Sequence, residues 1–186
     1  RAPWNENADS IYVVTIEEGV TTIGDYAFDL CSLLNNVTIA KRVTSIGQYA
    51  FNNCFNLRSI TVPENVTKIE RNCFCCCKNL FSIIILGQIT EIGDNAFYEC
   101  TILESILFST NSYSTRLVKD QEPISFPMSL ETIGSGSFYG CEKIESIEIP
   151  SSVTSIKKDT FNCCIKLRSV SLHSNIKNKI FMDFFI

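Results

Sequence analysis

Residues 34–56, LNNVTIAKRVTSIGQYAFNNCFN, are one copy of a unit that recurs along the chain. Three markers recur in phase: an isoleucine (Ile46 here), a phenylalanine five residues later and a cysteine three residues after that. The phenylalanines are separated by steps of 23, 23, 23, 41 and 23 residues, and 41 is 23 plus 18. They are Phe28, Phe51, Phe74, Phe97, Phe138 and Phe161. A fixed period in the twenties predicts a solenoid of stacked coils.

The composition of one copy explains how a coil forms. Val37 and Ile39 flank a threonine, an alternation typical of a short strand with one buried face. Gly47 suits a tight turn, after which Phe51 and Cys54 return to the core from the opposite side. One copy cannot bury its own apolar face, so stability must come from interfaces between neighbouring copies. We therefore expect one short strand per coil, with all of these strands aligned in one parallel sheet on the concave side. The residues expected to align are Val37, Ile60, Ile83, Ile106, Ile147 and Val170.

The repeat can be written L-x-x-I-x-I-x-x-x-V-T-x-I-G-x-x-A-F-x-x-C-x-x, and residues 43–63 read VTSIGQYAFNNCFNLRSITVP. This pattern resembles the BspA-type leucine-rich repeat family, the Treponema-type branch found in bacterial and protist surface proteins. The resemblance extends from Ile11 to about Leu172. It implies a leucine-rich repeat solenoid of about seven 23-residue coils, with a parallel concave β-sheet and an irregular or short helical convex side.

The ends of the chain depart from the repeat. Residues 1–10 lack the pattern and include the only tryptophan, Trp4, which we interpret as part of an N-terminal cap rather than a binding group. Residues 11–172 form the solenoid, and residues 173–186 form a degenerate C-terminal coil or cap. The segment IFMDFFI at residues 180–186 has six apolar residues in seven and is expected to cover the last coil. The alternative is that it begins another element of a longer protein.

The repeat is interrupted once, by 18 extra residues at about residues 109–126. Ile106 and Phe108 fill the two strand positions before the interruption, and Ile124 and Phe126 fill the same positions after it. The insertion carries Tyr113, Arg116 and Lys119, which we select as candidate binding residues. Insertions in solenoids often lie on the binding face. A tolerated surface loop is the alternative, because the entropy of closing a longer loop grows slowly.

Side chains next to the buried strand residues should face outward and differ between copies. Most of these outward residues are polar or small, but Ile84, Leu86 and Leu107 are apolar and fall on adjacent coils near the insertion. A cluster of exposed apolar residues marks contact sites more often than scattered ones do. Two interpretations remain open at this point: a binding patch shared with the insertion, or an area that the inserted loop itself covers.

Ten cysteines are present, and six of them occupy the same repeat position beside the phenylalanine. Free cysteine is often a small buried hydrophobe, so we expect a ladder of buried thiols, with one or two disulfides as the alternative. Cys73 and Cys76 have C-x-x-C spacing, but a structural zinc site needs four ligands and the only histidine is His173. We therefore predict no metal site and no cofactor.

Several function classes are disfavoured by composition. With one histidine near the C-terminal end, a nucleophilic triad is improbable, and no catalytic residues are predicted. The formal charge of −4 and the lack of a basic run argue against nucleic acid as a partner. No apolar stretch reaches the roughly 20 residues of a membrane span. What remains is a non-enzymatic module with an extended interaction surface.

The resemblance adds a context to this module. It implies adhesion or host interaction at a cell surface or as a secreted protein, with a host or extracellular-matrix protein as the partner. A structural or scaffold module inside the cell is the alternative and is consistent with unpaired thiols. The sequence does not determine the oligomeric state. Two N-x-T sequons, at Asn36 and Asn65, are candidate glycosylation sites, and Asn65 is the better one because it falls in a turn.

Overall fold

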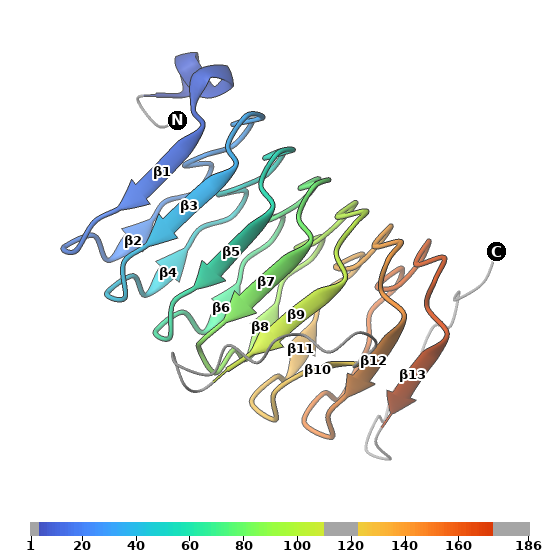
Figure 1. The fold of residues 1–186 in the computed structure, drawn as a ribbon. Coiled ribbons are helices and arrows are strands. Elements are labelled where there is room, and N and C mark those ends of the chain that lie inside the picture. The colour runs from blue at the N-terminus through green and yellow to red at the C-terminus, as the bar shows by residue number, and fades with distance from the viewer. Residues whose placement is uncertain (1–3, 110–122, 173–186) are drawn as a thin grey trace.

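The computed structural model describes residues 4–109 and 123–172, and all structural statements below concern these residues. They form a solenoid of parallel strands in two rows, with the strands of successive coils side by side (Figure 1). The described chain makes about six coils, and strand β13 begins a seventh, so the expected number of about seven is slightly too high. Helix is confined, within this part of the chain, to a single 3-10 segment, η1 (Asn5–Ser10).

One row, called the long-strand row, contains seven four-residue strands and the two-residue β10, and the other row contains five two-residue strands. The long strands are β1 (Val13–Ile16), β3 (Asn36–Ile39), β5 (Ser59–Val62), β7 (Ser82–Ile85), β9 (Ser105–Phe108), β10 (Ile124–Ser125), β12 (Ser146–Ile149) and β13 (Ser169–Leu172). The short strands are β2 (Thr22–Ile23), β4 (Ser45–Ile46), β6 (Lys68–Ile69), β8 (Glu91–Ile92) and β11 (Thr132–Ile133). The expectation of one strand per coil is therefore wrong, because the residues before the repeated turn also pair between coils.

A column of aromatic rings runs through the core. Neighbouring rings are stacked with centroids 5.3 to 5.6 Å apart and planes within 19° of parallel. The members, in order, are Trp4, Phe28, Phe51, Phe74, Phe97, Phe138 and Phe161. Trp4 ends the column by stacking on Phe28 and donating its indole N–H to the carbonyl of Ala27 at 2.7 Å. Stacked rings of this kind contribute beyond the area that they bury.

A second column consists of thiols. Each ladder cysteine after the first donates its S–H to the carbonyl of the phenylalanine 26 or 44 residues earlier, at 3.1 to 3.2 Å. The donors are Cys54, Cys77, Cys100, Cys141 and Cys164. All ten cysteines are unpaired, as the interpretation of buried thiols predicts, and no disulfide is formed. The repeated cysteine thus satisfies a buried carbonyl while filling the space of a small apolar side chain.

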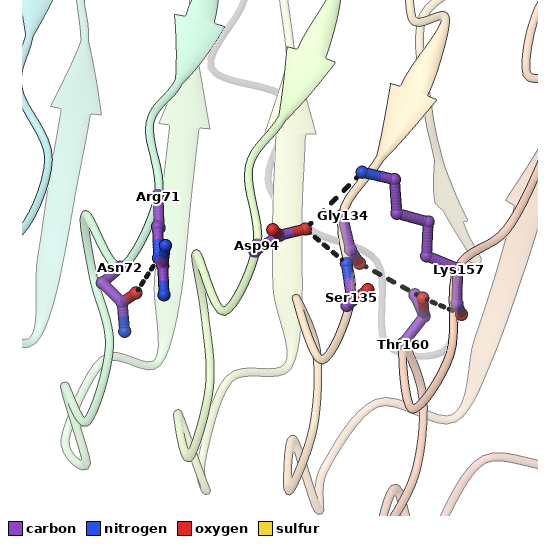
Figure 2. Close-up of polar contacts among 7 residues, drawn as sticks. All are labelled: Arg71, Asn72, Asp94, Gly134, Ser135, Lys157 and Thr160. Atoms are coloured by element: carbon purple, nitrogen blue, oxygen red, sulfur yellow. Dashed lines mark hydrogen bonds and ion pairs between the residues drawn. The ribbon is translucent and has the colours of Figure 1, made fainter.

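The coils approach so closely in the short-strand row that only glycine fits after the strand. A Cβ atom on Gly47 or Gly134 would collide with backbone atoms of the preceding coil. Figure 2 shows how Asp94 uses this proximity: its carboxylate accepts a hydrogen bond from the N–H of Ser135 at 2.8 Å. The ammonium of Lys157, one coil further on, lies 3.7 Å from the same carboxylate.

Two repeat positions decide where the ladders break. In the short-strand row, Glu70 and Lys157 replace the glycine. There, β4 and β6 are not paired, and Ile156 forms only an isolated bridge with Ile133. Gly47 and Gly93 donate their N–H groups to the isoleucine of the preceding coil at 2.8 Å, and the equivalent bond from Glu70 to Ile46 is not formed in the described chain. Glycine was expected at this turn for its backbone freedom, but its main role is this close approach.

In the long-strand row the decisive residue follows the strand. Where it has an N–H, as in Ala40 and Leu86, that N–H donates to the preceding coil at 3.0 to 3.1 Å and four residue pairs form. Where it is proline the bond is impossible. The strand that precedes Pro63 (β5) and the strand that precedes Pro127 (β10) do not pair with the preceding coil. The strand that precedes Pro150 (β12) pairs with both residues of β10. The expectation of one continuous sheet is therefore wrong. The strands keep their register but form three hydrogen-bonded sheets, β1-β3, β5-β7-β9 and β10-β12-β13.

The insertion changes only one of the two rows. Strands β9 and β10, on either side of it, occupy successive places in the long-strand row (Figure 1). In the short-strand row β8 pairs directly with β11 across the same interval, and Phe97 stacks directly on Phe138. Ile124 and Phe126 are buried, as expected for residues at the two strand positions after the insertion. Residues 110–122 lie outside the described residues.

The aromatic column should carry much of the stability. Phe51 is completely buried and is stacked on both sides. Phe51→Ala is expected to lower the free energy of unfolding by about 3–5 kcal/mol because of the cavity that it leaves. Phe55→Ala, at a ring that is 38% exposed, is the matched control and should change it by less than about 1 kcal/mol. Denaturant unfolding measures both, and equal effects would contradict the assignment of the column as the core.

Two glycines at the same repeat position allow a direct test of coil spacing. Gly24 lies in the first coil, and an added Cβ would meet nothing within 4 Å. Gly24→Ala should therefore leave stability unchanged or raise it by up to about 1 kcal/mol. Gly47→Ala, which would push on the first coil, should cost about 1–3 kcal/mol. Thermal and denaturant unfolding of the two variants would refute the spacing argument if they ranked in the opposite order.

Candidate binding site

The apolar residues selected from the sequence lie together on the long-strand face. Ile84 and Leu107 are directly opposite each other in the β7–β9 ladder, and both are half-buried. Leu86 follows two residues after Ile84 and is also half-buried. The equivalent residues of the neighbouring strands are polar. Thr61 on β5 lies opposite Ile84, and beyond Leu107 the hydroxyl of Ser125 on β10 donates to Glu148 on β12 at 2.6 Å. We call Ile84, Leu86 and Leu107 the apolar patch.

The three candidate residues of the insertion cannot be placed beside this patch. Tyr113, Arg116 and Lys119 lie outside the described residues. The strand ends on both sides of the insertion, Phe108 and Ile124, belong to the neighbouring strands β9 and β10. The insertion therefore leaves and re-enters next to the apolar patch, because β9 also carries Leu107.

A groove of about 1030 Å³ follows the edge at which the coils enter the long strands. Its polar lining includes the amides of Asn35, Asn36, Asn56 and Asn79 and the guanidinium of Arg58. Tyr12 and Phe81, which are 55% and 47% exposed, add aromatic surface to its walls. The sequence analysis did not select this groove, although asparagine at the same position in two coils, Asn56 and Asn79, was a signal for it.

The groove is centred on the junction of the second and third coils, which we call the seam. Along this edge the N–H of Asn35 donates to Tyr12, and the N–H of Phe81 donates to Arg58, both at 2.9 Å. The equivalent bond from Arg58 to Asn35 is not formed in the described chain. Both strand rows are also unpaired at the seam. Strand β5, which ends before Pro63, does not pair with β3, and β6, which ends before Glu70, does not pair with β4. The strands of the two coils are unpaired there, although main-chain bonds such as those from Phe51 to Cys73 and from Asn79 to Phe55 still join the coils.

The chemistry of the groove suits a polar, extended ligand. The amide of Asn79 donates to that of Asn56 at 3.2 Å, so amides of successive coils form a short ladder with donors and acceptors left over. Among the described residues that line the groove, Arg58 is the only charged one. Neutral or acidic chains are therefore better suited to it than basic ones.

The two sequons differ in their surroundings. Asn36 lines the groove and is exposed. Asn65 is also exposed, but its amide donates to the carbonyl of Lys41 across the seam at 3.0 Å. A glycan on Asn36 would occupy the groove, whereas one on Asn65 would remove a link between the second and third coils.

The described residues contain no cluster of three or more histidine, cysteine or acidic side chains placed to hold a metal ion. Cys73, the first residue of the C-x-x-C pair, is fully buried at a position where three other coils have alanine. Within the same residues no helix is long and apolar enough to cross a membrane.

These observations define a leucine-rich repeat solenoid. The family model described as the BspA type leucine rich repeat region matches residues 6–118 and 116–185 in six copies. The chain therefore belongs to the BspA-type leucine-rich repeat family, as the sequence pattern indicated. This family indicates a protein-interaction module.

Solved structures agree with this assignment. The leucine-rich repeat protein of T. pallidum is 26% identical and superposes with a TM-score of 0.71, over 86% of this chain and 68% of that one. A leucine-rich repeat protein of Bacteroides ovatus is 30% identical, with a TM-score of 0.70, over 87% of this chain and 39% of that one. The chain thus spans about two fifths of the Bacteroides protein. Comparison with curated proteins gives no match.

The seam can be tested through amide exchange. In a strand, alternate N–H groups point to the same neighbour, so the N–H of Thr61 points from the third coil to the second. We expect its hydrogen exchange to be at least tenfold faster than that of Thr38 and Ile84, the equivalent residues of paired strands. Exchange measured by NMR would contradict the seam if Thr61 were as protected as the other two.

Restoring the missing donor provides a second test of the same junction. Pro63→Ala supplies an N–H at the position where Ala40 and Leu86 bond to the preceding coil. The variant should slow the exchange of Thr61, because the new bond to Ile39 closes the ladder. Pro150→Ala, at another junction, is the matched control and should leave Thr61 unchanged.

Proposed function

We propose that this protein is an adhesion or host-interaction module at a cell surface or in the secreted state, and that it binds a host or extracellular-matrix protein. The observation that carries the proposal is the contrast between a repeated core and a variable face. The core repeats its phenylalanine and cysteine in every coil, while the outward residues of the long strands change from threonine to the apolar patch and then to serine and glutamate. Each coil therefore presents a different outward side chain, as specific binding along an extended surface requires.

In this proposal the apolar patch contributes most of the binding free energy. Interfaces depend on a few buried apolar or aromatic anchors surrounded by polar groups that exclude water. The patch has that arrangement, with Thr61 on one side of Ile84 and Ser125 beyond Leu107 along the row of strands. The insertion, which emerges beside the patch, supplies Tyr113, Arg116 and Lys119 as further contacts. The groove at the seam extends the surface toward the first coil with amides that can pair with a polypeptide backbone.

The experiment is binding of the chain to a panel of purified extracellular-matrix proteins by surface plasmon resonance. Leu107→Arg places a charge in the patch and should weaken binding at least tenfold, the loss expected for an interface anchor. Ile165→Arg makes the same change at a residue that is 75% exposed in the last complete coil and away from the patch. It should leave the affinity within twofold.

Two outcomes would overturn the proposal. One is that no protein of the panel binds with a dissociation constant below about 100 μM, or roughly 5 kcal/mol. The other is that the two variants lose affinity equally while both remain folded by circular dichroism. The second outcome would place the contact outside the long-strand face.

A further inference from the structure

The third coil carries two neighbouring cysteines on its outer turn. Cys75 and Cys76 stand where the second coil has two asparagines and the fourth has Tyr98 and Glu99. Their sulfur atoms are 3.6 Å apart. Cys76 has a φ of 60°, and this left-handed turn accompanies the approach of its sulfur to that of its neighbour. Cys75 is buried and Cys76 is half-exposed, so only one of the two thiols faces solvent.

The two thiols share one hydrogen bond, and burial decides the direction. Charge is disfavoured where water is excluded, so the buried Cys75 keeps its proton and donates it to Cys76. This hydrogen bond lowers the pKa of Cys76 to about 7, helped by the ammonium of Lys78 and opposed by burial and by Glu99. The same bond, together with burial, raises the pKa of Cys75. Tyr98 faces the pair from the next coil, and burial and the Glu99 charge raise its pKa as well.

The other thiols are less suited than Cys76 to act as nucleophiles. Five ladder cysteines donate their S–H to carbonyls in the core, and burial raises the pKa of each. Cys31 and Cys73 are buried as well. Cys163 is exposed, but its S–H donates to the side-chain oxygen of Asn162 at 3.5 Å. Reactive cysteines are partly exposed thiolates. Cys76 combines partial exposure with a neighbouring thiol that lies within hydrogen-bond distance of its sulfur.

The pair is poorly built to close into a disulfide with itself. Adjacent Cα atoms lie about 3.8 Å apart across a trans peptide, whereas disulfides usually need about 4.4–6.8 Å. No cis peptide is present in the described chain. Cys75 also holds its proton, and the thiolate is the form that attacks. A sulfur group attached to Cys76 would therefore persist instead of being displaced by its neighbour.

We propose that Cys76, with Cys75 as its hydrogen-bond donor, is a site of reversible S-thiolation by low-molecular-weight disulfides. The thiolate of Cys76 attacks one sulfur of the disulfide, forming a new S–S bond as the original one breaks. The other half leaves as a thiolate and takes up a proton from water. The number of disulfide bonds is unchanged, so the small disulfide is the oxidant and no further reactant is needed. An excess of a small thiol reverses the step.

The test uses oxidised glutathione as the probe and the whole folded chain. Intact-mass and fragment-ion spectra should show one glutathione per chain, attached at Cys76. With a pKa of about 7, about half of Cys76 is thiolate at pH 7, against about 3% of an ordinary thiol with a pKa near 8.5. The rate should accordingly rise through a midpoint near pH 7. Cys163→Ser, the matched control at the exposed thiol, should leave both the rate and the midpoint unchanged.

Variants of Cys75 separate the proposed role from a merely structural one. Cys75→Ala removes the donor, and the rate at pH 7 should fall about tenfold as the midpoint moves upward. Cys75→Ser keeps a hydroxyl donor and should retain most of the rate and the low midpoint. Circular dichroism confirms that each variant is folded before its rate is compared.

Three results would overturn the proposal. The first is an adduct that forms on Cys163 before Cys76 or is spread over several cysteines of the folded chain. The second is loss of two hydrogens with a bond between Cys75 and Cys76. The third is a pH midpoint that is the same in the native chain and in Cys75→Ala. The first two results need no substitution, so they test the proposal even if a variant fails to fold.

Discussion

The spacing between successive coils is the constraint on which the rest of the structure depends. It must be short enough for main-chain hydrogen bonds in both strand rows and, at the same time, long enough for stacked rings about 5.5 Å apart in the core. Glycine after the short strand and an N–H after the long strand meet the first condition. The repeated phenylalanine meets the second. The cysteine links the two, because its S–H satisfies a core carbonyl of the neighbouring coil.

Departures from the repeat therefore act on whole interfaces and not on single residues. At the seam, Pro63 removes a donor and Glu70 adds a side chain where the backbone must pass, so both ladders open together. The core does not open, since Phe51 and Phe74 remain stacked at 5.6 Å and Cys77 still bonds to Phe51. The chain thus gains a groove on one edge without losing the continuity of its core. The junction keeps the column of rings while it gives up the pairing of strands.

The fold could be predicted from the sequence alone because the same residue types recur at the same positions of every coil. Phe51, Ile46 and Cys54 repeat in phase, and their burial follows from stacking. The two strand rows and the three separate sheets could not be reached in the same way, because they depend on which backbone groups of neighbouring coils meet. Pro63 is evident in the sequence, but the sequence analysis did not connect it with the loss of the main-chain hydrogen bond to the preceding coil. The residues of the apolar patch could be selected because side chains alternate along a strand, while the groove lies at a junction of unpaired strands, which the period does not encode.

The repeat also explains why chemistry can be placed on a rigid rod without a deep pocket. Every coil has an outer turn with two residues in the left-handed region, and in the third coil the second of these is Cys76. The turn is required by the fold, so the approach of Cys75 and Cys76 is imposed by a geometry that the neighbouring coils share. Only the residue types differ. In the third coil they place two sulfur atoms side by side, one as hydrogen-bond donor and the other as acceptor. The face that binds a partner and the edge that holds the thiols are therefore set by different repeat positions, and either can change without disturbing the core.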